Sequence, residues 1–265
     1  MKPPRFDYVA PASVEEALPL LGEAGTVLAG GQSLVPLLNL RLARPELVVD
    51  INGLVELDHI RAGDGALRIG AMTRQVTLER SAMVRERWPL LHKAVRLVGH
   101  SQTRSRGTVG GSVAHADPAA ELPAALIALR ARVHLRSAAG ARTVEASDFF
   151  RGPFHTVRDP EELLMEIEMP EQPDGAGAGF AEHARTHGDF ATAGAAAVVG
   201  PDGQAGLALL GAGPAPARAE AAERALADGA APHEAGALAA QGVKDEHRRA
   251  LCTELARRAI EEALE

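Results

Sequence analysis

Two short glycine-rich segments constrain the fold of this chain more than any other feature of its sequence. The first glycine segment, Ala29-Gly-Gly-Gln-Ser-Leu-Val-Pro36, follows an expected strand at residues 26–29 and opens an expected helix at residues 34–42. The second glycine segment, Thr108-Val-Gly-Gly-Ser112, also has two glycines flanked by hydroxyl residues. Consecutive glycines let a backbone approach a phosphate closely, and successive N–H groups beside a helix N-terminus attract an anion. The pair could hold a diphosphate from both sides, although two tight turns without a ligand explain the same residues.

Two common nucleotide-binding motifs are absent. Neither G-x-G-x-x-G nor G-x-x-x-x-G-K-[ST] occurs, so the usual NAD-binding fold and a P-loop are not supported. The chain has 265 residues, of which 46% are hydrophobic, enough to bury a sizeable core in one large domain or two smaller ones. Its net charge of −7, without a basic stripe, argues against nucleic acid as a partner.

The chain contains one cysteine, Cys252. A single thiol cannot form an internal disulfide, a four-cysteine zinc site or a four-cysteine iron–sulfur cluster. Redox chemistry would therefore need an organic cofactor or another subunit.

No apolar run approaches the roughly 20 residues that span a bilayer, and the first residues lack the apolar region of a secretory signal. We therefore expect no membrane span and a cytoplasmic location.

Alternation of apolar runs with helical patterns predicts an α/β or α+β arrangement and not an all-helical one, and we expect the α+β class. Ser13 and Glu16 form an expected capping box, and Pro19 should shorten the helix that they open. The patterns predict strands at 47–51, 67–71 and 132–136 and helices at 89–98 and 122–130.

The polar, apolar-poor stretch at residues 171–179 predicts a flexible domain boundary. After it come three expected strands and two expected helices, a pattern typical of a small α+β module with an antiparallel sheet. The strands are expected at 180–185, 192–199 and 206–210, and the helices at 217–228 and 247–264.

Several polar residues lie near the second glycine segment. His115, Asp117 and Glu121 could share a metal ion, but their spacing matches no strong ligand motif. Asp117 precedes a proline, which favours a helix cap. Glu121 could cap the same helix or form a hydrogen bond with a cofactor, and the sequence leaves both open.

Cationic residues lie just before that segment. A cation such as Arg104 or Arg106, with His100 beside them, would stabilise a phosphate or another negative charge, but a solvated surface is the default interpretation. Asp189 is interpreted as a turn residue.

Taken in order and spacing, these motifs resemble the FAD-binding medium subunit of the molybdenum hydroxylases, the family of aerobic carbon monoxide dehydrogenase and xanthine dehydrogenase. The resemblance rests first on AGGQSLVPLLNLRLARPELVVDI (29–51), IGAMT (69–73) and TRSRGTVGGSVAHADPAAELPA (103–124). It extends to ELLMEIEMP (162–170), HGDFATAGAA (187–196), LGAGPAPARA (210–219) and DEHRRALCTELARRAI (245–260), and so covers nearly the whole chain.

The resemblance implies a fold. It predicts a p-cresol methylhydroxylase-type FAD-binding region at residues 1–175, made of two α/β subdomains that meet near residues 55–60. A C-terminal domain with an antiparallel sheet would occupy residues 176–265. FAD would lie between the two subdomains.

It also implies a cofactor site without catalytic residues or metal ligands of its own. Many relatives carry Asp at the position of Glu121 and Asn at the position of Ser112; both changes keep hydrogen-bonding capacity and affect only fine geometry. The FAD-binding positions are Val27, Leu28, Ala29, Gly30, Gly31, Gln32, Ser33, Leu34, Thr108, Val109, Gly110, Gly111, Ser112, Glu121, Leu164 and Met165.

The implied function is electron transfer. In the family, substrate is oxidised at a molybdenum–pterin centre in a large subunit, and electrons pass through two [2Fe-2S] clusters in a small subunit to FAD. This predicts a heterotrimer, or a dimer of heterotrimers, whose substrate and final acceptor (quinone, NAD or oxygen) the chain does not name. The alternatives are a stand-alone FAD-dependent oxidase or dehydrogenase and a flavin-free assembly protein. Intact glycine motifs count against the latter, and the lack of an obvious substrate pocket in the C-terminal part counts against the former.

Overall fold

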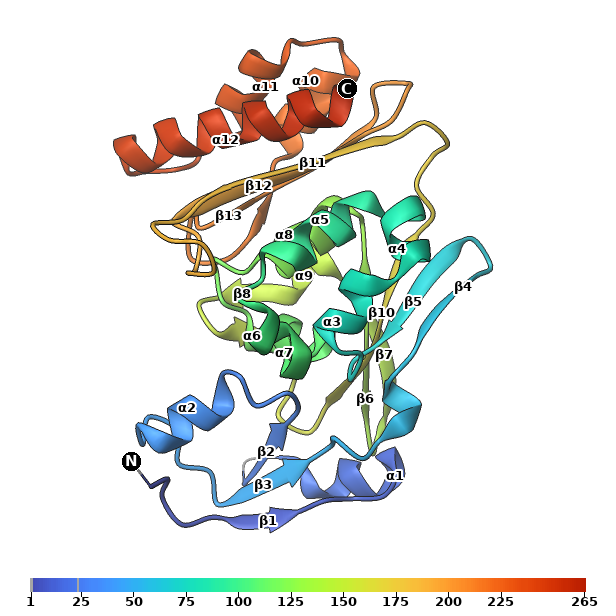
Figure 1. The fold of residues 1–265 in the computed structure, drawn as a ribbon, viewed down its shortest axis with the longest axis vertical. Coiled ribbons are helices and arrows are strands. Elements are labelled where there is room, and N and C mark those ends of the chain that lie inside the picture. Colours follow the sequence, from blue (N-terminus) through green and yellow to red (C-terminus); the bar gives the residue numbers. More distant parts are fainter. Residues whose placement is uncertain (1, 23) are drawn as a thin grey trace.

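The computed structural model describes residues 2–22 and 24–265. Three sheets follow one another along the long axis of the molecule, from the N-terminal end to the C-terminal end (Figure 1). Among the described residues, no helix combines the length and the apolar character needed to cross a membrane.

The N-terminal sheet is parallel, in the order β1-β3-β2, and carries the first glycine segment at the end of β2. Ser13 begins the first helix as predicted, because its Oγ accepts a hydrogen bond from the Glu16 N–H at 3.2 Å. The helix after the glycine segment is shorter than expected, because Arg41 adopts a positive φ of 59° and the Leu42 N–H turns back to the Leu37 carbonyl at 2.9 Å. The elements are β1 (Asp7–Val9), α1 (Val14–Ala17), η1 (Leu18–Leu20), β2 (Gly25–Leu28), α2 (Leu34–Asn39), β3 (Leu47–Asp50) and η2 (Val55–Leu57).

The central sheet is antiparallel, in the order β4-β5-β10-β6-β7. β10 comes from much later in the chain and lies in the middle of the sheet, so the central sheet is complete only when β10 pairs with β5 and β6. The strands are β4 (Ile60–Gly63), β5 (Ala66–Gly70), β6 (Arg132–Ser137), β7 (Gly140–Glu145) and β10 (Leu163–Pro170), and a small hairpin is formed by β8 (Phe150–Gly152) and β9 (His155–Thr156).

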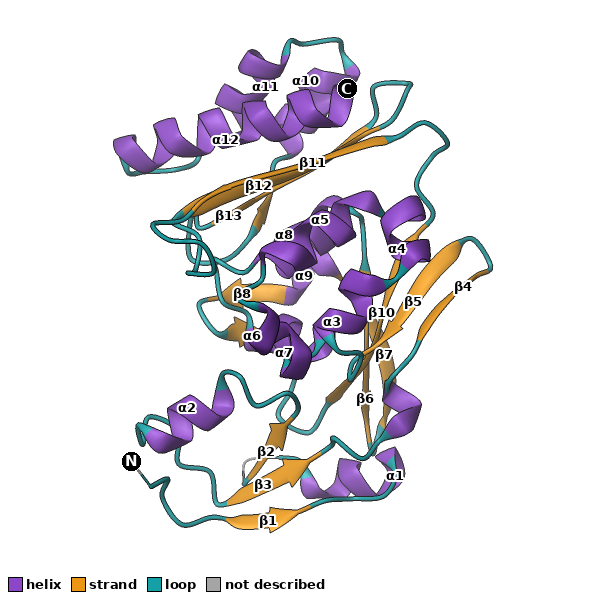
Figure 2. Ribbon diagram, in the orientation of Figure 1, coloured by secondary structure: helices purple, strands orange, loops and turns teal. Residues whose placement is uncertain are grey.

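Helices cover one face of the central sheet, and α5 and α8 lie between it and the C-terminal sheet (Figure 2). α8 is buried along its whole length, and a Cβ on Gly206 of the C-terminal sheet would overlap the Ala128 carbonyl at its end. The helices and the two sheets therefore share one core. The helices are α3 (Gln75–Arg80), α4 (Ala82–Arg87), α5 (Pro89–Leu97), α6 (Ser101–Arg106), α7 (Val109–His115), α8 (Glu121–Ala128) and α9 (Ala146–Phe149).

The C-terminal sheet is antiparallel, as predicted, in the order β11-β12-β13-β14, with three helices on its outer face. The prediction of a flexible stretch through residue 179 is wrong at its end, because Gly177 and Gly179 belong to β11. A Cβ on either would overlap a carbonyl oxygen of the last helix, at Ala263 and Ala259 respectively, so glycine lets helix and strand backbones touch. The elements are β11 (Gly177–His183), β12 (Ala193–Val199), β13 (Ala205–Leu210), β14 (Ala217–Arg218), α10 (Glu220–Ala227), α11 (Pro232–Ala239) and α12 (Glu246–Leu264).

Candidate functional site

A large cleft of about 1230 Å³ brings both glycine segments together. Its other walls come from the start of α8, the β8–β9 hairpin with the loop that follows, and the loop at residues 188–190. The cleft exceeds the roughly 300–1,000 Å³ typical of drug-sized ligands, so it can take a longer molecule.

The structure places most of the expected cofactor-binding residues on this cleft. Three of them lie behind its surface: Val109 is buried in the central core, Met165 packs against the N-terminal core, and Leu28 lies beneath Gly31. The residues that line the cleft are Val27, Ala29, Gly30, Gly31, Gln32, Ser33, Leu34, Thr108, Gly110, Gly111, Ser112, Glu121 and Leu164.

The first glycine segment offers free backbone donors. Gly31 has a positive φ of 75°, which turns the chain sharply at the end of β2. Within the described part of the chain, none of the N–H groups from Gly30 to Leu34 donates a hydrogen bond, and the first to do so is Val35, which binds the Gly31 carbonyl at 3.1 Å. Successive free N–H groups in such a turn form a concave site for an anion.

The second glycine segment has another geometry. It is the first turn of α7 and not the glycine turn predicted from the sequence, and neither glycine has a positive φ. Thr108 caps the helix by accepting the Gly111 N–H at 3.1 Å, and the Gly110 N–H donates to the Ala71 carbonyl at 2.9 Å. Its amides are therefore already satisfied inside the protein.

The glycines of the second segment serve close packing. A Cβ on Gly110 would lie 2.6 Å from Ala71 Cβ and 2.8 Å from the Ala71 backbone. A Cβ on Gly111 would lie 2.6 Å from Thr108 Oγ1, the oxygen that caps α7, and 3.7 Å from Ala29 Cβ. The second segment thus packs α7 against the end of β5 and also meets the first segment.

Asn52 and Arg74 join the two segments, in an arrangement that we call the Asn52–Arg74 clasp. Asn52 Nδ2 donates to the Ala29 carbonyl at 2.7 Å, and Arg74 Nη2 donates to Asn52 Oδ1 at 2.7 Å. Arg74 Nη1 also donates to the Arg106 carbonyl at 2.5 Å, just before the second segment. The clasp was not predicted from the sequence; its only signal was a polar residue, Asn52, two positions after the strand that ends at Asp50.

Glu121 lies on the cleft wall but does not cap α8. It is the first residue of the helix, after Ala120 at the N-cap position, and its side chain is 4% exposed. The pKa of Glu121 is raised to about 8, mainly by burial; a hydrogen bond from its own backbone N–H opposes this rise, and the nearby carboxylates Glu182 and Asp117 contribute to it. The prediction that Asp117 caps the helix is wrong, because its Oδ1 accepts the Ala119 N–H at 2.8 Å and forms a turn before the helix.

The expected solvated surface before the second segment is wrong at Arg104. This side chain is 9% exposed, and it binds Glu79 through Nε at 2.8 Å and Nη2 at 3.1 Å. It also donates to the Val98 and Gly99 carbonyls, so it fastens the turn before α6 rather than facing a ligand.

Other cleft residues were not singled out from the sequence. Arg151, His155 and Arg158 line the cleft from the RGPFHTVRDP segment, whose two arginines and histidine around a turn were the only signal. Gln75 also lines it, and its buried Oε1 has no hydrogen-bond partner among the described residues. An unpartnered acceptor, free amides and a long cleft all fit the FAD that the sequence led us to expect.

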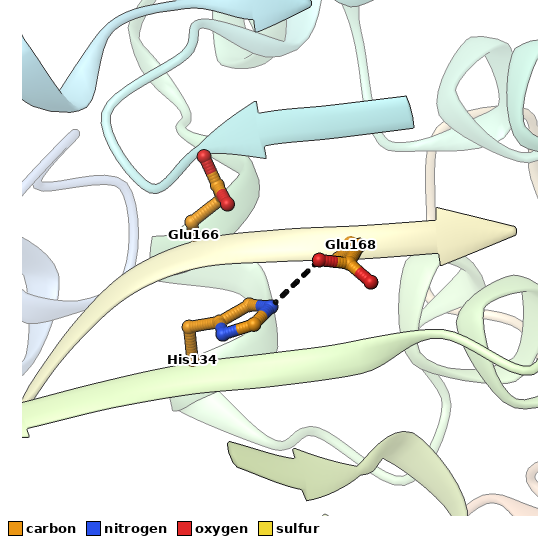
Figure 3. Close-up of side chains that lie close together, drawn as sticks. All are labelled: His134, Glu166 and Glu168. Carbon is orange, nitrogen blue, oxygen red and sulfur yellow. Dashed lines mark ion pairs between the residues drawn. The ribbon is translucent and has the colours of Figure 1, made fainter. Parts of the chain in front are cut away.

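The three residues considered for a shared metal ion, His115, Asp117 and Glu121, do not bring their ligand atoms together. In the part of the chain that the structure describes, one such trio occurs outside the cleft, on the other face of the central sheet: His134, Glu166 and Glu168 (Figure 3). Arg68 and Arg132 pair with Glu168, and His59 pairs with Glu166 at 2.8 Å. Glu168 is neutralised by two arginines and Glu166 is hydrogen-bonded to His59, so these side chains form a polar network of their own.

Comparison with known proteins identifies the family. A family model described as the FAD binding domain in molybdopterin dehydrogenase matches residues 4–172. The chain belongs to the FAD-binding medium subunits of the molybdenum hydroxylases. This medium subunit is thus part of an oxidoreductase and binds FAD, and its predicted fold class is confirmed.

Among its relatives, this medium subunit is 45% identical to the 6-hydroxypseudooxynicotine dehydrogenase complex subunit alpha of Paenarthrobacter nicotinovorans over 236 residues, 86% of this chain and 80% of that one. It is 44% identical to the carbon monoxide dehydrogenase medium chain of Hydrogenophaga pseudoflava over 206 residues, 77% and 72% of the two chains. The solved carbon monoxide dehydrogenase from Hydrogenophaga pseudoflava matches with a TM-score of 0.94 at 39% identity, over 100% of this chain and 99% of that chain.

Proposed function

We propose that this medium subunit receives electrons from the iron–sulfur clusters of a small partner subunit and passes them through FAD to an external acceptor. Substrate would be oxidised at a molybdenum–pterin centre in a large partner subunit. The observation that carries the proposal is the cleft in which the first glycine segment presents its free amides beside the second. The single cysteine supports it, because the clusters must then belong to another chain.

The names of the relatives support a division of labour between subunits. They include complexes named for caffeine, carbon monoxide and glyceraldehyde, at 41%, 44% and 42% identity to this chain. The substrate varies while the FAD subunit stays similar. The substrate would therefore be selected in the large subunit and not by the residues described here.

We assign the cofactor contacts as follows. The free amides of Gly30 to Leu34 would bind the diphosphate, with Thr108 and Ser112 closing the cleft from the other side. Glu121 would form a hydrogen bond with the cofactor, and Leu164 would supply apolar contact. Leu28, Val109 and Met165 would support these residues from behind. When bound, FAD supplies the redox chemistry, and the protein binds it, orients it and excludes water.

We also propose the division of the chain that the sequence suggested. Residues 1–175 would form the FAD-binding domain and residues 176–265 the C-terminal domain. A parallel sheet ends at Asp50 and an antiparallel sheet begins at Ile60, which supports a subdomain boundary near residues 55–60.

Flavin reduction in reconstituted complexes tests the electron-transfer proposal. With its iron–sulfur and molybdenum partners, the flavin absorbance of this subunit should bleach on addition of the complex's substrate, as followed by stopped-flow absorbance. The chain alone should respond only to an artificial donor such as dithionite. Substrate-dependent bleaching of the single chain would instead indicate a self-contained flavin dehydrogenase.

A further inference from the structure

Most of the fully buried glutamates in the described chain are paired with arginine. Glu162 binds Arg142 at 2.6 Å, and Glu223 binds Arg130 at 2.8 Å. Glu168 binds two arginines on the outer face of the central sheet. Because an unpaired buried charge is costly, such partners are what keep a buried carboxyl ionised.

Glu121 and Glu182 break this pattern. The side chain of Glu121 forms no ion pair or hydrogen bond with any described lysine, arginine or histidine, although it is 4% exposed. Glu182 lies on β11, on the same face as Ala178 and Phe180, which pack into the central core. Its Oε2 is buried without a hydrogen-bond partner among the described residues. Glu121 thus approaches from the start of α8 and Glu182 from β11, where the Gly211 N–H donates to the Pro118 carbonyl at 2.8 Å and joins the C-terminal sheet to the turn before α8.

We propose that Glu121 and Glu182 form an interdomain carboxyl pair that holds a proton at neutral pH, and that Glu121 donates this proton in a hydrogen bond to FAD. The inference rests on the proposed function, because it needs FAD in the cleft that Glu121 lines. Glu182 does not line the cleft and acts through Glu121, so it is a positioning residue for the proton.

The chemistry follows from the protonation state. A protonated carboxyl has an O–H donor, which an ionised one lacks, and a buried donor needs an acceptor. FAD carries many acceptor oxygens and nitrogens. Burial raises the pKa of Glu182 to about 7 and that of Glu121 to about 8, which agrees with the lack of a cationic partner.

Other charged groups near Glu121 do not supply a counter-charge. Asp117 adds a like charge, and burial lowers the pKa of His115 on α7, which favours its neutral form. Arg158 lines the cleft, but it donates to the Asp159 and Glu162 carbonyls at 2.9 and 2.7 Å. Arg151 and His155, which also line the cleft, do not act on the pKa of Glu121.

The charged groups on the elements packed against α8 and β11 are also committed elsewhere. Lys93 of α5 pairs with Glu262 of α12. Arg218 of β14 pairs with Glu223 at 2.8 Å. Among the described charged groups, Glu182 therefore has the largest effect on whether Glu121 keeps its proton.

The pH dependence of FAD affinity tests the inference. FAD is titrated into the flavin-free complex and into the chain alone, from about pH 6 to about pH 9, and binding is read from flavin fluorescence. Affinity should stay constant at low pH and then fall, approaching about tenfold per pH unit once Glu121 loses its proton above about pH 8.

Two conservative variants separate the roles. Glu121→Gln keeps an N–H donor that does not titrate, so its affinity should be independent of pH and within about threefold of the wild type at pH 7. Glu182→Gln removes the neighbouring charge, so the fall in affinity should move to lower pH. Glu246→Gln, an exposed position at the start of α12 without an ion pair among the described residues, is the matched control and should follow the wild type.

An infrared difference spectrum gives an independent readout. The C=O stretch of a protonated carboxyl should shift when FAD binds at neutral pH, and this band should be missing in Glu121→Gln. An affinity that rises with pH would mean that Glu121 accepts a hydrogen bond as an anion, and a flat wild-type profile would mean that no proton is involved. Either result overturns this inference but leaves FAD binding intact. Failure to bind FAD at any pH, in the complex and in the chain, would instead overturn the proposed function.

Discussion

The two glycine segments have nearly the same composition but opposite roles in the structure. In the first, Gly31 turns the chain through a positive φ and a run of N–H groups is left free. In the second, the N–H groups are used to start α7, and Gly110 allows that helix to touch Ala71. Glycine thus permits close approach of a ligand at one place and close approach of another backbone at the other.

Because of this difference, we expect substitutions in the two segments to have different effects. Damage to the second should first reduce stability, because it separates α7 from the sheet. Damage to the first should first reduce FAD affinity, because the free amides depend on its turn. Measuring stability and affinity in the same variants therefore decides whether the comparison holds.

The largest expected effect is that of Gly110→Val. Its Cβ would lie 2.6–2.8 Å from Ala71 atoms that include backbone, so α7 must move. Overpacking of this kind costs about 1–3 kcal/mol or more, and we expect a lower melting temperature or loss of folded protein. Gly53→Ala is the control, since a Cβ there meets nothing within 4 Å. A Gly110→Val protein as stable as the control would contradict the packing role.

Gly31→Ala should leave the protein folded but weaken FAD binding. A side chain at a φ of 75° costs about 1–2 kcal/mol, which corresponds to roughly five- to thirtyfold in affinity if the turn flattens. The matched variant Gly111→Ala has no positive φ to strain and its Cβ would displace the Thr108 hydroxyl, so it should lose stability and less affinity. Flavin fluorescence titration measures both, and equal losses would remove the distinction between the segments.

Asn52→Ala tests whether the clasp keeps the segments in register. It removes the side-chain bonds to the Ala29 carbonyl, to Asp50 Oδ1 and to Arg74, and a loss of about 1 kcal/mol would weaken FAD binding about fivefold. Asn52→Asp keeps the acceptor for Arg74, but it sets a carboxylate oxygen against the Ala29 carbonyl and against Asp50 Oδ1, so its affinity should be no higher than that of Asn52→Ala. If Asn52→Ala binds FAD as tightly as the wild type, the first segment holds its shape without the clasp.

The smallest effect concerns pH, and it sharpens the comparison because neither glycine segment titrates. The pKa of Glu121 is raised from 4.5 to about 8 in the folded chain, so between these values the folded state binds more protons than the unfolded state. Stability should therefore fall as pH rises through this window. Glu121→Gln should melt about 2 °C or more above the wild type at about pH 8, and the gap should close near pH 5. Differential scanning calorimetry at the two pH values would detect a gap of the opposite sign.

Local patterns predicted much of this fold. The strand before the first glycine segment, the helix cap at Ser13 and the helix that begins at Pro89 lie within one or two residues of their expected positions, although Glu16 completes the cap by accepting from the Ala12 N–H and not from Ser13. Each depends on neighbours in the sequence, such as a capping side chain or a proline at the first helical position. The helix at Pro232–Ala239 was missed, since its alanines and glycine show little polar–apolar periodicity.

Patterns could not predict contacts between distant segments. Arg104 was expected at the surface because its partner, Glu79, lies on another helix. Glu121 could be interpreted as a cap because its coupling to Glu182 crosses from α8 to β11. Likewise, Gly177 and Gly179 suggested a linker because the helix backbone that requires them comes at the end of the chain. Motifs located the cleft, but the protonation and packing of its walls depend on the folded chain.

The burial of α8 has a consequence for how the protein is made. The helix is apolar on all sides apart from Glu121, and its cover, β12 and β13, begins only at Ala193. At about 5–20 residues per second, the ribosome needs about 3 to 13 s to synthesise the intervening chain. During that interval the nascent helix lacks its C-terminal cover, so chaperones have a defined segment to hold. We expect a chain terminated before β12 to leave this side of α8 exposed and to aggregate more readily than the full chain.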